Sequence, residues 1–296
     1  MQTNQVYDVV CVGNYTKDTI VTPAGVRIVD GGAVNYAAHA GVKLGCKVLV
    51  VTRLAYEDYE RVIGELRSQG VDCLVKITPD STCIRLEYPG ENPDERKLSV
   101  TATAGTITAQ EVQGFRSHSA AIGATLRGEI ELETIQALRG KTELLAADVQ
   151  GFVRVLDGES LVFRPWERMA EILQYLDVLK ADAKEAEFLT GESDLRQAAR
   201  RFAALGPQEI LLTHAGGLIL YAQGKFTEAS FYSREIKGRS GRGDTCLGSY
   251  IARRVSDEPQ EAALWSAALT SLKMEKEGPF RGEPVDVARL VESRYR

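Results

Sequence analysis

A glycine-rich segment near the end of the chain, residues 238–246, has the composition of an anion site. Its glycines lead directly into residues 247–254, which have the apolar stripe of a helix. A glycine-rich turn that enters a helix leaves backbone N–H groups unpaired at the positive end of the helix dipole. Both features favour an anion, so we expect this segment to bind a phosphate group.

Asp244 is the residue of this segment that could take part in a reaction. Gly238 and Gly243 have the spacing of a P-loop, but a P-loop carries lysine at the position where this chain carries Asp244. A carboxylate there repels phosphate unless it accepts the proton of a hydroxyl that attacks the phosphorus. The pattern therefore indicates a general base, while a helix-capping aspartate explains it equally well.

Polar residues and glycines also follow the first predicted strand. Asp18 ends one such stretch, and Gly31, Gly32 and Asn35 stand at the start of a predicted helix. In open parallel sheets, ligands bind where the strands end. Carboxylate and amide groups at that edge can hold the hydroxyls of a small polyhydroxylated molecule. Each residue alone is better explained as a turn or cap residue, so the prediction depends on their joint placement.

The elements that would position these residues alternate between strand and helix. Residues 7–12 and 47–52 are short apolar runs typical of buried parallel strands, and residues 33–44 between them follow a helical pattern that stops at Gly45. Further strand patterns lie at 120–123, 144–149, 178–180 and 210–213, and helical patterns at 131–138, 166–175 and 195–205. The sequence predicts an α/β fold with an open, mostly parallel sheet and helices on both faces.

Residues 71–102 break this alternation. Three short strand patterns, at 71–77, 81–88 and 97–102, follow one another without a helical pattern between them. We expect them to form a small antiparallel β insert within a single domain of residues 1–296. Strands outside the main sheet need something to cover, so the insert would be a lid or a homodimer surface; an insert without function is the alternative.

Composition and charge argue against several classes of protein. The 296 residues include 36 Lys+Arg and 41 Asp+Glu, a formal net charge of −5, so no summed positive field favours nucleic acid or an anionic membrane. Neither a membrane-spanning apolar run nor a signal-peptide pattern is present, and we expect a cytoplasmic protein. The five cysteines and three histidines are scattered, without the spacing of a disulfide framework or a zinc site.

Four motifs occur in the order found in one known family. They are the element at residues 13–18, the Gly31-Gly32-x-x-Asn35 motif, residues 180–191, and Gly241-x-Gly243-Asp244. Together they span most of the chain, which resembles the ribokinase/PfkB family of carbohydrate kinases. The resemblance implies a ribokinase-like fold, and the predicted insert agrees in place with the lid of that family.

On the acceptor side, the resemblance implies that Asp18 and Asn35 hold substrate hydroxyls and that Gly31 and Gly32 lie at the lid hinge. Asp244 would then be the general base. The anion hole for the transferred phosphoryl group would be formed by the amides of Gly241, Arg242 and Gly243.

On the donor side, the resemblance implies ATP with Mg²⁺, and a monovalent cation is a further candidate cofactor. Asp182 and Glu185 would organise the Mg²⁺ through water, as suits an ion that loses its hydration shell reluctantly. The residues implied at the nucleotide are Thr213, Gly216 and Gly217, with 267–278 along the adenine.

The expected function is therefore an ATP-dependent kinase that phosphorylates a hydroxyl of a sugar or polyol. A nucleoside kinase of the same family and a non-catalytic relative that binds a ligand or a partner are the alternatives. The second is suggested by three departures from the family pattern, at Asp182, Gly238 and Arg242. A nicotinamide-dependent dehydrogenase is disfavoured because no GxGxxG follows the first strand.

Overall fold

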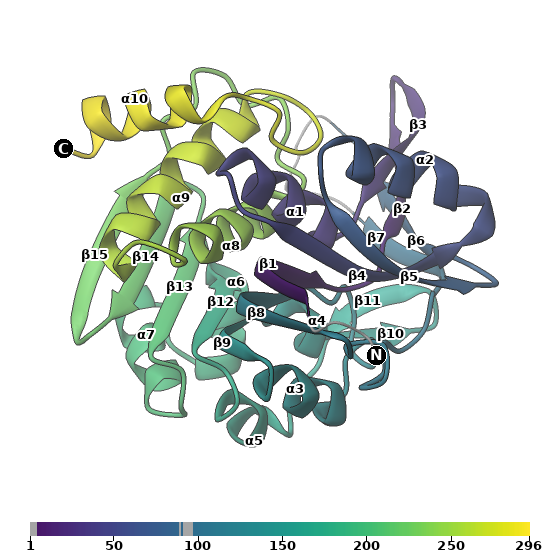
Figure 1. Cartoon of the computed structure of the whole chain (residues 1–296), viewed down its shortest axis with the longest axis horizontal. Helices are drawn as coiled ribbons and strands as arrows, with labels where there is room; N and C mark the ends of the chain where they lie inside the picture. The colour runs from purple at the N-terminus through teal and green to yellow at the C-terminus, as the bar shows by residue number, and fades with distance from the viewer. Residues whose placement is uncertain (1–4, 89, 91–96) are drawn as a thin grey trace.

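The computed structural model describes residues 5–88, 90 and 97–296. The strands of its main sheet are β1 (Gln5–Val12), β4 (Val48–Ala55), β5 (Asp72–Thr78), β8 (Phe115–Ile122), β9 (Thr142–Asp148), β12 (Val178–Asp182), β13 (Glu209–His214), β14 (Gly217–Ala222) and β15 (Lys225–Ser230). Their order is β15-β14-β13-β12-β9-β8-β1-β4-β5 (Figure 1). The strands from β13 to β5 are parallel, and β14 and β15 form an antiparallel edge.

Helices cover both faces of this sheet, which confirms the predicted α/β fold. They are α1 (Ala33–Lys43), α2 (Tyr56–Ser68), α3 (Leu132–Arg139), α4 (Gln150–Val153), α5 (Met169–Leu173), α6 (Ala183–Thr190), α7 (Leu195–Ala203), α8 (Arg242–Arg253), α9 (Pro259–Met274) and α10 (Pro284–Arg294). Within the described residues, no helix is long and apolar enough to cross a membrane.

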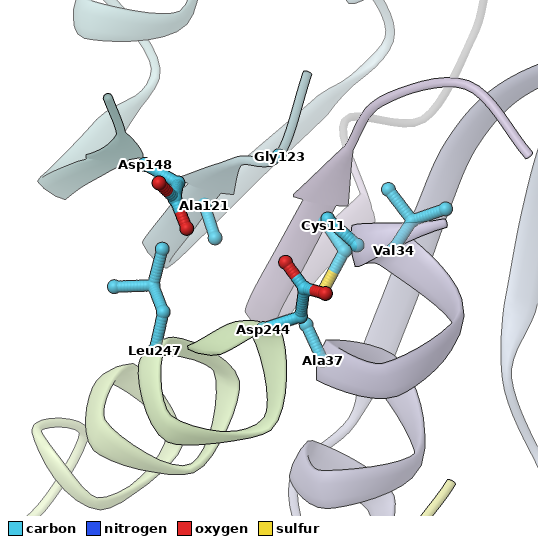
Figure 2. Close-up of a pocket in the computed structure, with 9 residues that line it drawn as sticks. Cys11, Val34, Ala37, Ala121, Gly123, Asp148, Asp244 and Leu247 are labelled. Carbon is cyan, nitrogen blue, oxygen red and sulfur yellow. The ribbon is translucent and has the colours of Figure 1, made fainter. Parts of the chain in front are cut away.

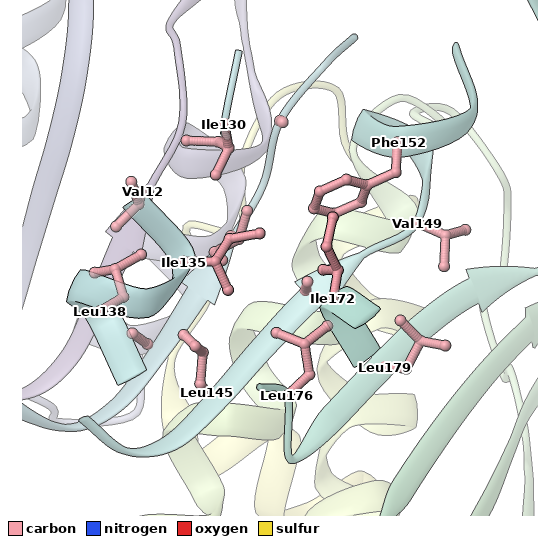
Figure 3. Close-up of a cluster of buried hydrophobic side chains, with 14 of the residues drawn as sticks. Val12, Ile130, Ile135, Leu138, Leu145, Val149, Phe152, Ile172, Leu176 and Leu179 are labelled. Atoms are coloured by element: carbon pink, nitrogen blue, oxygen red, sulfur yellow. The ribbon is translucent and has the colours of Figure 1, made fainter. Parts of the chain in front are cut away.

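The core shows how the two faces arise from the strand pattern. Successive side chains of a strand point to opposite faces. On β1, Val10 and Val12 accordingly join the hydrophobic cluster under α3, α5 and α7 (Figure 3), whereas Val9 and Cys11 join the cluster under α1, α2, α8 and α9. All four side chains are buried, so β1 lies at the centre of the molecule.

A second sheet, which we call the lid sheet, lies beside the main sheet (Figure 1). Its strands are β2 (Thr16–Thr22), β3 (Gly25–Gly31), β6 (Thr82–Glu87), β7 (Lys97–Ala102), β10 (Arg154–Asp157) and β11 (Ser160–Phe163). Their order is β10-β11-β7-β6-β2-β3. The sheet has a small core of its own, formed by Ile20, Ile84, Leu86 and Val100.

The composition of the lid sheet corrects the prediction for residues 71–102. Strand β5 pairs in parallel with β4 and belongs to the main sheet, because α2 returns the chain to the sheet edge as a β-α-β unit. Only β6 and β7 of the predicted insert lie in the lid sheet. These two strands pair antiparallel, as predicted. The hairpin β2–β3 and the hairpin β10–β11 complete the lid sheet, and β2 pairs in parallel with β6.

Candidate functional site

The first turn of α8 brings Asp244 together with the predicted anion-hole residues. Gly241 precedes the helix with a φ of +72°, a left-handed conformation that glycine adopts without strain. Arg242, Gly243 and Asp244 follow as the first three helical residues. The N–H groups of a first helical turn have no partner within the helix, so this turn can donate to an anion.

Asp244 lies at the meeting point of α8, α1 and the ends of three central strands (Figure 2). The close approach of the two helices depends on Gly248, where a Cβ would come within 2.4 Å of Ala37 Cα. Asp244 shares a small cavity with Asp148 at the end of β9 and Gly123 after β8. The carboxyl ends of the strands therefore converge on Asp244, where a ligand is expected in an open α/β sheet.

Burial raises the pKa of Asp244 above the ordinary range of an aspartate. The positive charges of Lys180, Arg154 and Lys273 act against this effect, and Glu185 adds to it. A carboxylate with a raised pKa accepts a proton more readily than one in water. The surroundings of Asp244 thus suit a general base.

Lys180 and Asp148 form a buried ion pair next to this site that the sequence analysis did not identify. Their Cα atoms are partners in the parallel register of β12 and β9, and Lys180 Nζ donates to Asp148 Oδ2 over 2.7 Å. A Cβ on Gly243 would lie 2.6 Å from Lys180 Nζ, so the ammonium group lies directly against the anion-hole backbone. A lysine inside an apolar strand was the signal that could have revealed it.

Asp182 and Glu185 act together at the start of α6. Asp182 Oδ1 accepts from Glu185 N–H, and Glu185 Oε2 accepts from Asp182 N–H, both over 2.8 Å. This reciprocal capping box fixes the position of both carboxylates. Arg154 donates to Glu185 Oε1 over 3.3 Å, and burial raises the pKa of Glu185. In the described part of the chain, no three His, Cys, Asp or Glu side chains form a group that could hold a metal ion.

The acceptor-side residues lie where the lid sheet meets α1. Gly31 ends β3, and Gly32 precedes α1 with a φ of +92°. The Asp18 carboxylate lies against Gly31, because a Cβ there would come within 2.4 Å of Asp18 Oδ2. Asn35 is buried in the first turn of α1 and donates from Nδ2 to Asp30 O over 3.2 Å. The structure therefore brings Asp18, Gly31, Gly32 and Asn35 together.

Tyr36 connects the acceptor side to the anion hole, and the sequence analysis did not predict it. A Cβ on Gly241 would come within 2.2 Å of the Tyr36 ring, so the ring rests on the backbone of the anion hole. Burial raises the pKa of Tyr36 to about 12, and the charges of Asp18 and Asp244 contribute to this rise. Tyr36 therefore lies close enough to both carboxylates for their charges to affect its pKa.

A cleft of ≈ 580 Å³ opens between the lid sheet, α1 and the segments around residues 236–240 and 277–281. Asn35, Tyr36 and His39 line it from α1, and Ile20 and Val29 from the lid sheet. His39 Nδ1 contacts Asn35 O over 2.8 Å, and burial lowers its pKa, so the imidazole is neutral at pH 7. The cleft has the mixed apolar and polar lining that suits a small polyhydroxylated molecule.

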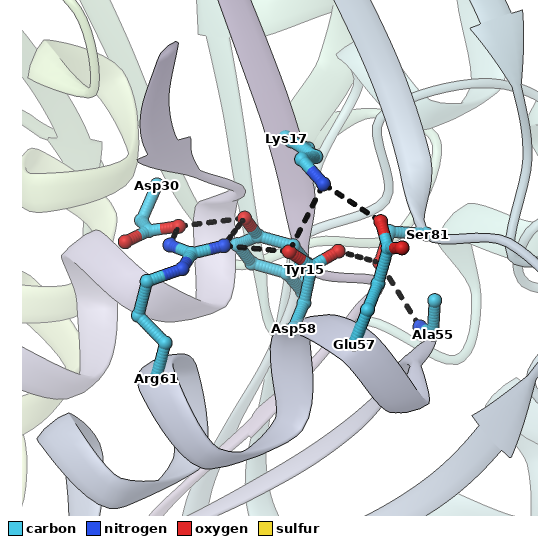
Figure 4. A network of polar contacts seen from close by, with 8 residues as sticks. All are labelled: Tyr15, Lys17, Asp30, Ala55, Glu57, Asp58, Arg61 and Ser81. Carbon is cyan, nitrogen blue, oxygen red and sulfur yellow. Dashed lines mark hydrogen bonds and ion pairs between the residues drawn. The ribbon is translucent and has the colours of Figure 1, made fainter.

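Ion pairs attach the lid sheet to the body of the protein (Figure 4). Arg61 of α2 contacts Asp30 of β3 and donates to the Tyr15 hydroxyl over 3.2 Å. Lys17 of β2 lies 3.2 Å from Asp58 Oδ1, and Arg61 lies 2.6 Å from the same oxygen. The hairpin β2–β3 is thereby held over the cleft from the side of α2.

Of the predicted nucleotide residues, Thr213 lies beside a magnesium candidate, and Gly216 and Gly217 lie at the turn that follows. Thr213, near the end of β13, is the register partner of Asp182. Gly217 begins β14 at a point where a Cβ would come within 2.4 Å of Ala229 O, so the close pairing of β14 with β15 requires glycine. Gly216 precedes it and donates from its N–H to His214 Nδ1 over 3.2 Å.

The region expected along an adenine, residues 267–278, begins in the buried part of α9 and reaches the exposed residues Lys276 and Glu277 near its end. From Ala267 to Ser271, the side chains of α9 are buried. The Ser271 Oγ accepts from Tyr232 N–H over 2.9 Å, and Glu275 Oε1 accepts from Arg234 N–H over 2.9 Å. The segment after β15 therefore lies directly against the C-terminal part of α9.

Comparisons with known proteins show the family of this chain. The model of the pfkB family carbohydrate kinases matches residues 2–285. A pyrophosphate-dependent kinase in the ribokinase family, solved with a pyrophosphate analog and myo-inositol, is 36% identical, with 92% of this chain and 97% of that chain covered and a TM-score of 0.85.

Two further proteins are similar at lower identity. A cytidine kinase from Thermococcus kodakarensis is 24% identical over 86% of this chain and 91% of its own length. The ribokinase of Arabidopsis thaliana, solved with ribose and ATP, shares the fold at 18% identity, with 97% and 99% of the two chains covered and a TM-score of 0.76. Because the family model matches nearly the whole of the present chain, the protein belongs to the PfkB family of carbohydrate kinases.

Proposed function

We propose that this kinase transfers a phosphoryl group to a hydroxyl of a sugar or polyol, with Asp244 as general base and the amides of Gly241, Arg242 and Gly243 as anion hole. The observation that carries the proposal is the position of Asp244: it lies in the first turn of α8, beside these amides, at the convergent ends of the central strands. Asp18 and Asn35 are placed to bind the acceptor hydroxyls from the lid side.

The transfer follows from these positions. Asp244 takes the proton of the acceptor hydroxyl while that oxygen forms a bond to the terminal phosphorus of the donor. The bond from this phosphorus to the bridging oxygen breaks, and the rest of the donor, ADP in the case of ATP, leaves with the electron pair on that oxygen. The amides of the α8 turn and the Lys180 ammonium are placed to stabilise the negative charge of the transferred group. The Arg242 N–H donates to Arg239 O over 3.2 Å, so it has to exchange this contact for one to the phosphoryl oxygen.

Mg²⁺ fits the donor side through water. Both carboxylate oxygens of Glu185 accept hydrogen bonds from the protein, whereas Asp182 accepts the capping-box hydrogen bond with Oδ1 alone. A carboxylate pair of this kind suits the outer shell of a hydrated Mg²⁺. When bound, the ion would neutralise the phosphates of the donor, and Asp182 and Glu185 would orient its water ligands.

Among acceptors, the proposal favours a cyclic polyol such as myo-inositol, because the kinase bound to it is 36% identical. The cleft is large enough for a molecule of this size. A nucleoside is the alternative acceptor, in line with the 24% identical cytidine kinase.

ATP is the donor predicted from the sequence, and pyrophosphate is a second candidate that two observations favour. The kinase with 36% identity is pyrophosphate-dependent. In addition, the segment after β15 is hydrogen-bonded to α9 where an adenine was expected. A donor without a base needs no space there. With pyrophosphate, the leaving group is inorganic phosphate.

The test is a matrix of donors and acceptors. The purified protein is incubated with Mg²⁺, with ATP or pyrophosphate, and with myo-inositol, pentoses, hexoses or nucleosides, and phosphorylated product is measured by ³¹P NMR. An Asp244→Asn preparation controls for contaminating kinases. We expect product from a polyol or sugar, with the donor identified by the same spectra. If no acceptor yields product while ligands still shift the melting temperature, the non-catalytic alternative is the better account.

The predicted homodimer through the lid sheet stays a proposal. Ile84 and Leu86 are buried in the core of the lid sheet itself, whereas Val26 and Ile28 of β3 are exposed. A dimer would therefore have to use the β3 side. Analytical ultracentrifugation that shows only monomer would exclude it.

A further inference from the structure

Lys273, in the last turn of α9, has surroundings that are unusual for a lysine. Its side chain is only 2% exposed, and it is among the largest fully buried side chains of the described residues. Lysine is rarely buried to this degree unless a partner compensates its charge. The site described above does not require it, so its position needs an explanation of its own.

The partners of the Lys273 ammonium are backbone carbonyls. Nζ donates to Gly238 O over 2.8 Å and contacts Ser240 O. Asp244 and Glu277 attract the charge electrostatically. Two carbonyl oxygens from residues 238–240 thus converge on one buried cation. Carbonyl oxygens are also the groups with which proteins hold a bare monovalent cation such as K⁺.

The contact bears directly on the anion hole. Ser240 is followed by Gly241, which precedes α8, so the two carbonyls belong to the loop that sets the start of this helix. The same loop is bound to α9 a second time, since Gly238 N–H donates to Met274 O over 3.0 Å. The Lys273 Nζ also lies 5.1 Å from the centre of the Tyr36 ring, which rests on Gly241.

We propose that Lys273 is a positioning residue that serves as a built-in monovalent cation: its ammonium holds the carbonyls of Gly238 and Ser240 and so sets the anion hole for phosphoryl transfer. The inference rests on the proposed function. It replaces the monovalent cation considered in the sequence analysis with a side chain of the protein itself. Transfer should then need no added K⁺.

The charge state supports this role at neutral pH. Burial lowers the pKa of Lys273 to about 8, and the negative charges of Asp244 and Glu277 limit the decrease. Lys273 is therefore mostly protonated at pH 7. A bound polyphosphate would add negative charge nearby and favour the protonated form further.

The experiment removes the Lys273 ammonium in two ways, with and without leaving a cavity in its place. Lys273→Ala leaves carbonyls without their cation, whereas Lys273→Met fills the same volume with a neutral side chain. Turnover is measured for the wild type and both variants at pH 7 in chloride salts of K⁺, NH₄⁺, Li⁺ and tetramethylammonium, at constant ionic strength. Lys225→Ala, an exposed lysine of β15, is the matched control.

We expect the wild type and Lys225→Ala to have the same rate in every salt. In tetramethylammonium, Lys273→Ala and Lys273→Met should lose about 10- to 100-fold in kcat, the usual cost of removing a group that orients the reacting groups. K⁺ and NH₄⁺ should restore Lys273→Ala with saturation, Li⁺ should do so poorly, and no salt should restore Lys273→Met. A wild type that K⁺ activates, or a Lys273→Ala that K⁺ and NH₄⁺ leave inactive, overturns the proposal.

A measurement without substrate separates this proposal from the proposed function. K⁺ and NH₄⁺ should raise the melting temperature of Lys273→Ala above its value in tetramethylammonium, because they bind the vacated carbonyl site. The wild type should show no such difference. If no donor and acceptor pair reacts, the proposed function fails while the melting temperatures still test the cation site; equal shifts in the wild type and Lys273→Ala overturn the role of Lys273. If Lys273→Ala does not fold in any salt, the wild-type rate decides. A rate that depends on K⁺ contradicts the proposal, and a rate that is the same with and without K⁺ supports it.

Discussion

Two buried lysines lie against the anion-hole loop and differ in what compensates their charge. Lys180 of β12 donates to the Asp148 carboxylate over 2.7 Å, and Lys273 of α9 donates to the Gly238 carbonyl over 2.8 Å. Burial lowers the pKa of both side chains, but for Lys180 the charges of Asp148 and Glu185 outweigh it and the pKa is raised. For Lys273, burial prevails and the pKa falls to about 8.

The difference shows how one site obtains a permanent and an adjustable positive charge. A carboxylate at hydrogen-bond distance attracts a buried ammonium with a full charge, so Lys180 stays protonated at any physiological pH. Carbonyl groups offer only dipoles, so the protonation of Lys273 depends on pH and on nearby anions. Both lysines face the negative charge of Asp244, so its removal separates the two cases.

The largest effect is expected for Asp244→Asn. Removal of the general base should lower kcat by about 10²- to 10⁴-fold. The pKa of Lys273 should fall further, because Asp244 is the first of the charges that raise it, while Lys180 keeps Asp148 and Glu185. Steady-state kinetics and lysine-selective NMR titration measure the two effects.

Asp286→Asn, on the exposed side of α10, is the control for Asp244→Asn. It should leave both kcat and the lysine titrations unchanged. An Asp244→Asn protein that retains a tenth or more of the wild-type kcat would exclude Asp244 as the base.

The next effect concerns the permanent charge. Asp148→Asn leaves the Lys180 ammonium buried without its carboxylate, which should lower the free energy of unfolding by about 3–5 kcal/mol. The double variant Asp148→Asn/Lys180→Met removes the stranded charge and should recover most of this stability but not the activity. Urea denaturation of the single and double variants measures the difference. Equal stability of the two would show that Glu185 and Asp244 compensate the Lys180 charge without Asp148.

The sequence could predict the parts of the site that are local in the chain. Gly241, Gly243 and Asp244 follow one another at a helix start, and turn chemistry with helix periodicity is enough to place them. The α/β core was predictable for the same reason, because each β-α unit has its own apolar pattern. The lid sheet was not, since β2 and β6 pair across 66 residues of sequence, as in Thr16 with Thr82, and most of β3 is exposed.

Both lysines escaped prediction for a related reason. Lys180 meets Asp148 only through the register of β12 and β9, and Lys273 meets Gly238 only when α9 folds against the loop before α8. Such contacts depend on the packing of distant elements. A lysine in an otherwise apolar stretch was the only local signal of either one.

The third effect is the response to pH, which should separate the adjustable charge from the permanent one. Above about pH 8 the ligand-free protein loses the proton of Lys273, so kcat/KM should decrease as pH rises through this value, and kcat should decrease at a higher pH because the bound donor favours the protonated form. Asp244, Glu277 and Tyr36 face the ammonium, and burial raises the pKa of Tyr36 to about 12, above this range. The Lys273→Met variant should lack this decrease.

Stability should change in the opposite direction. Between about pH 8 and the ordinary lysine pKa of 10.5, the unfolded chain still binds a proton that folded Lys273 has lost. The free energy of unfolding of the wild type should therefore rise relative to Lys273→Met, by up to about 1.4 kcal/mol per pH unit. Urea denaturation at pH 7 to 10 tests the sign. A parallel fall of activity and relative stability would contradict the assignment.

The smallest effect is expected where charges are exposed to solvent, at the attachment of the lid sheet. The Arg61 side chain is 46% exposed, and Asp58 keeps Lys17 and the Ser81 hydroxyl when Arg61 is removed. Arg61→Gln should therefore lower the free energy of unfolding by less than about 1 kcal/mol, because water screens such pairs. Its effect should instead appear in the KM for the acceptor, since β3 is held less firmly over the cleft. If Arg61→Gln destabilised the fold as much as Asp148→Asn, burial would not be what distinguishes the charges of this protein, and the contrast between Lys180 and Lys273 would need another cause.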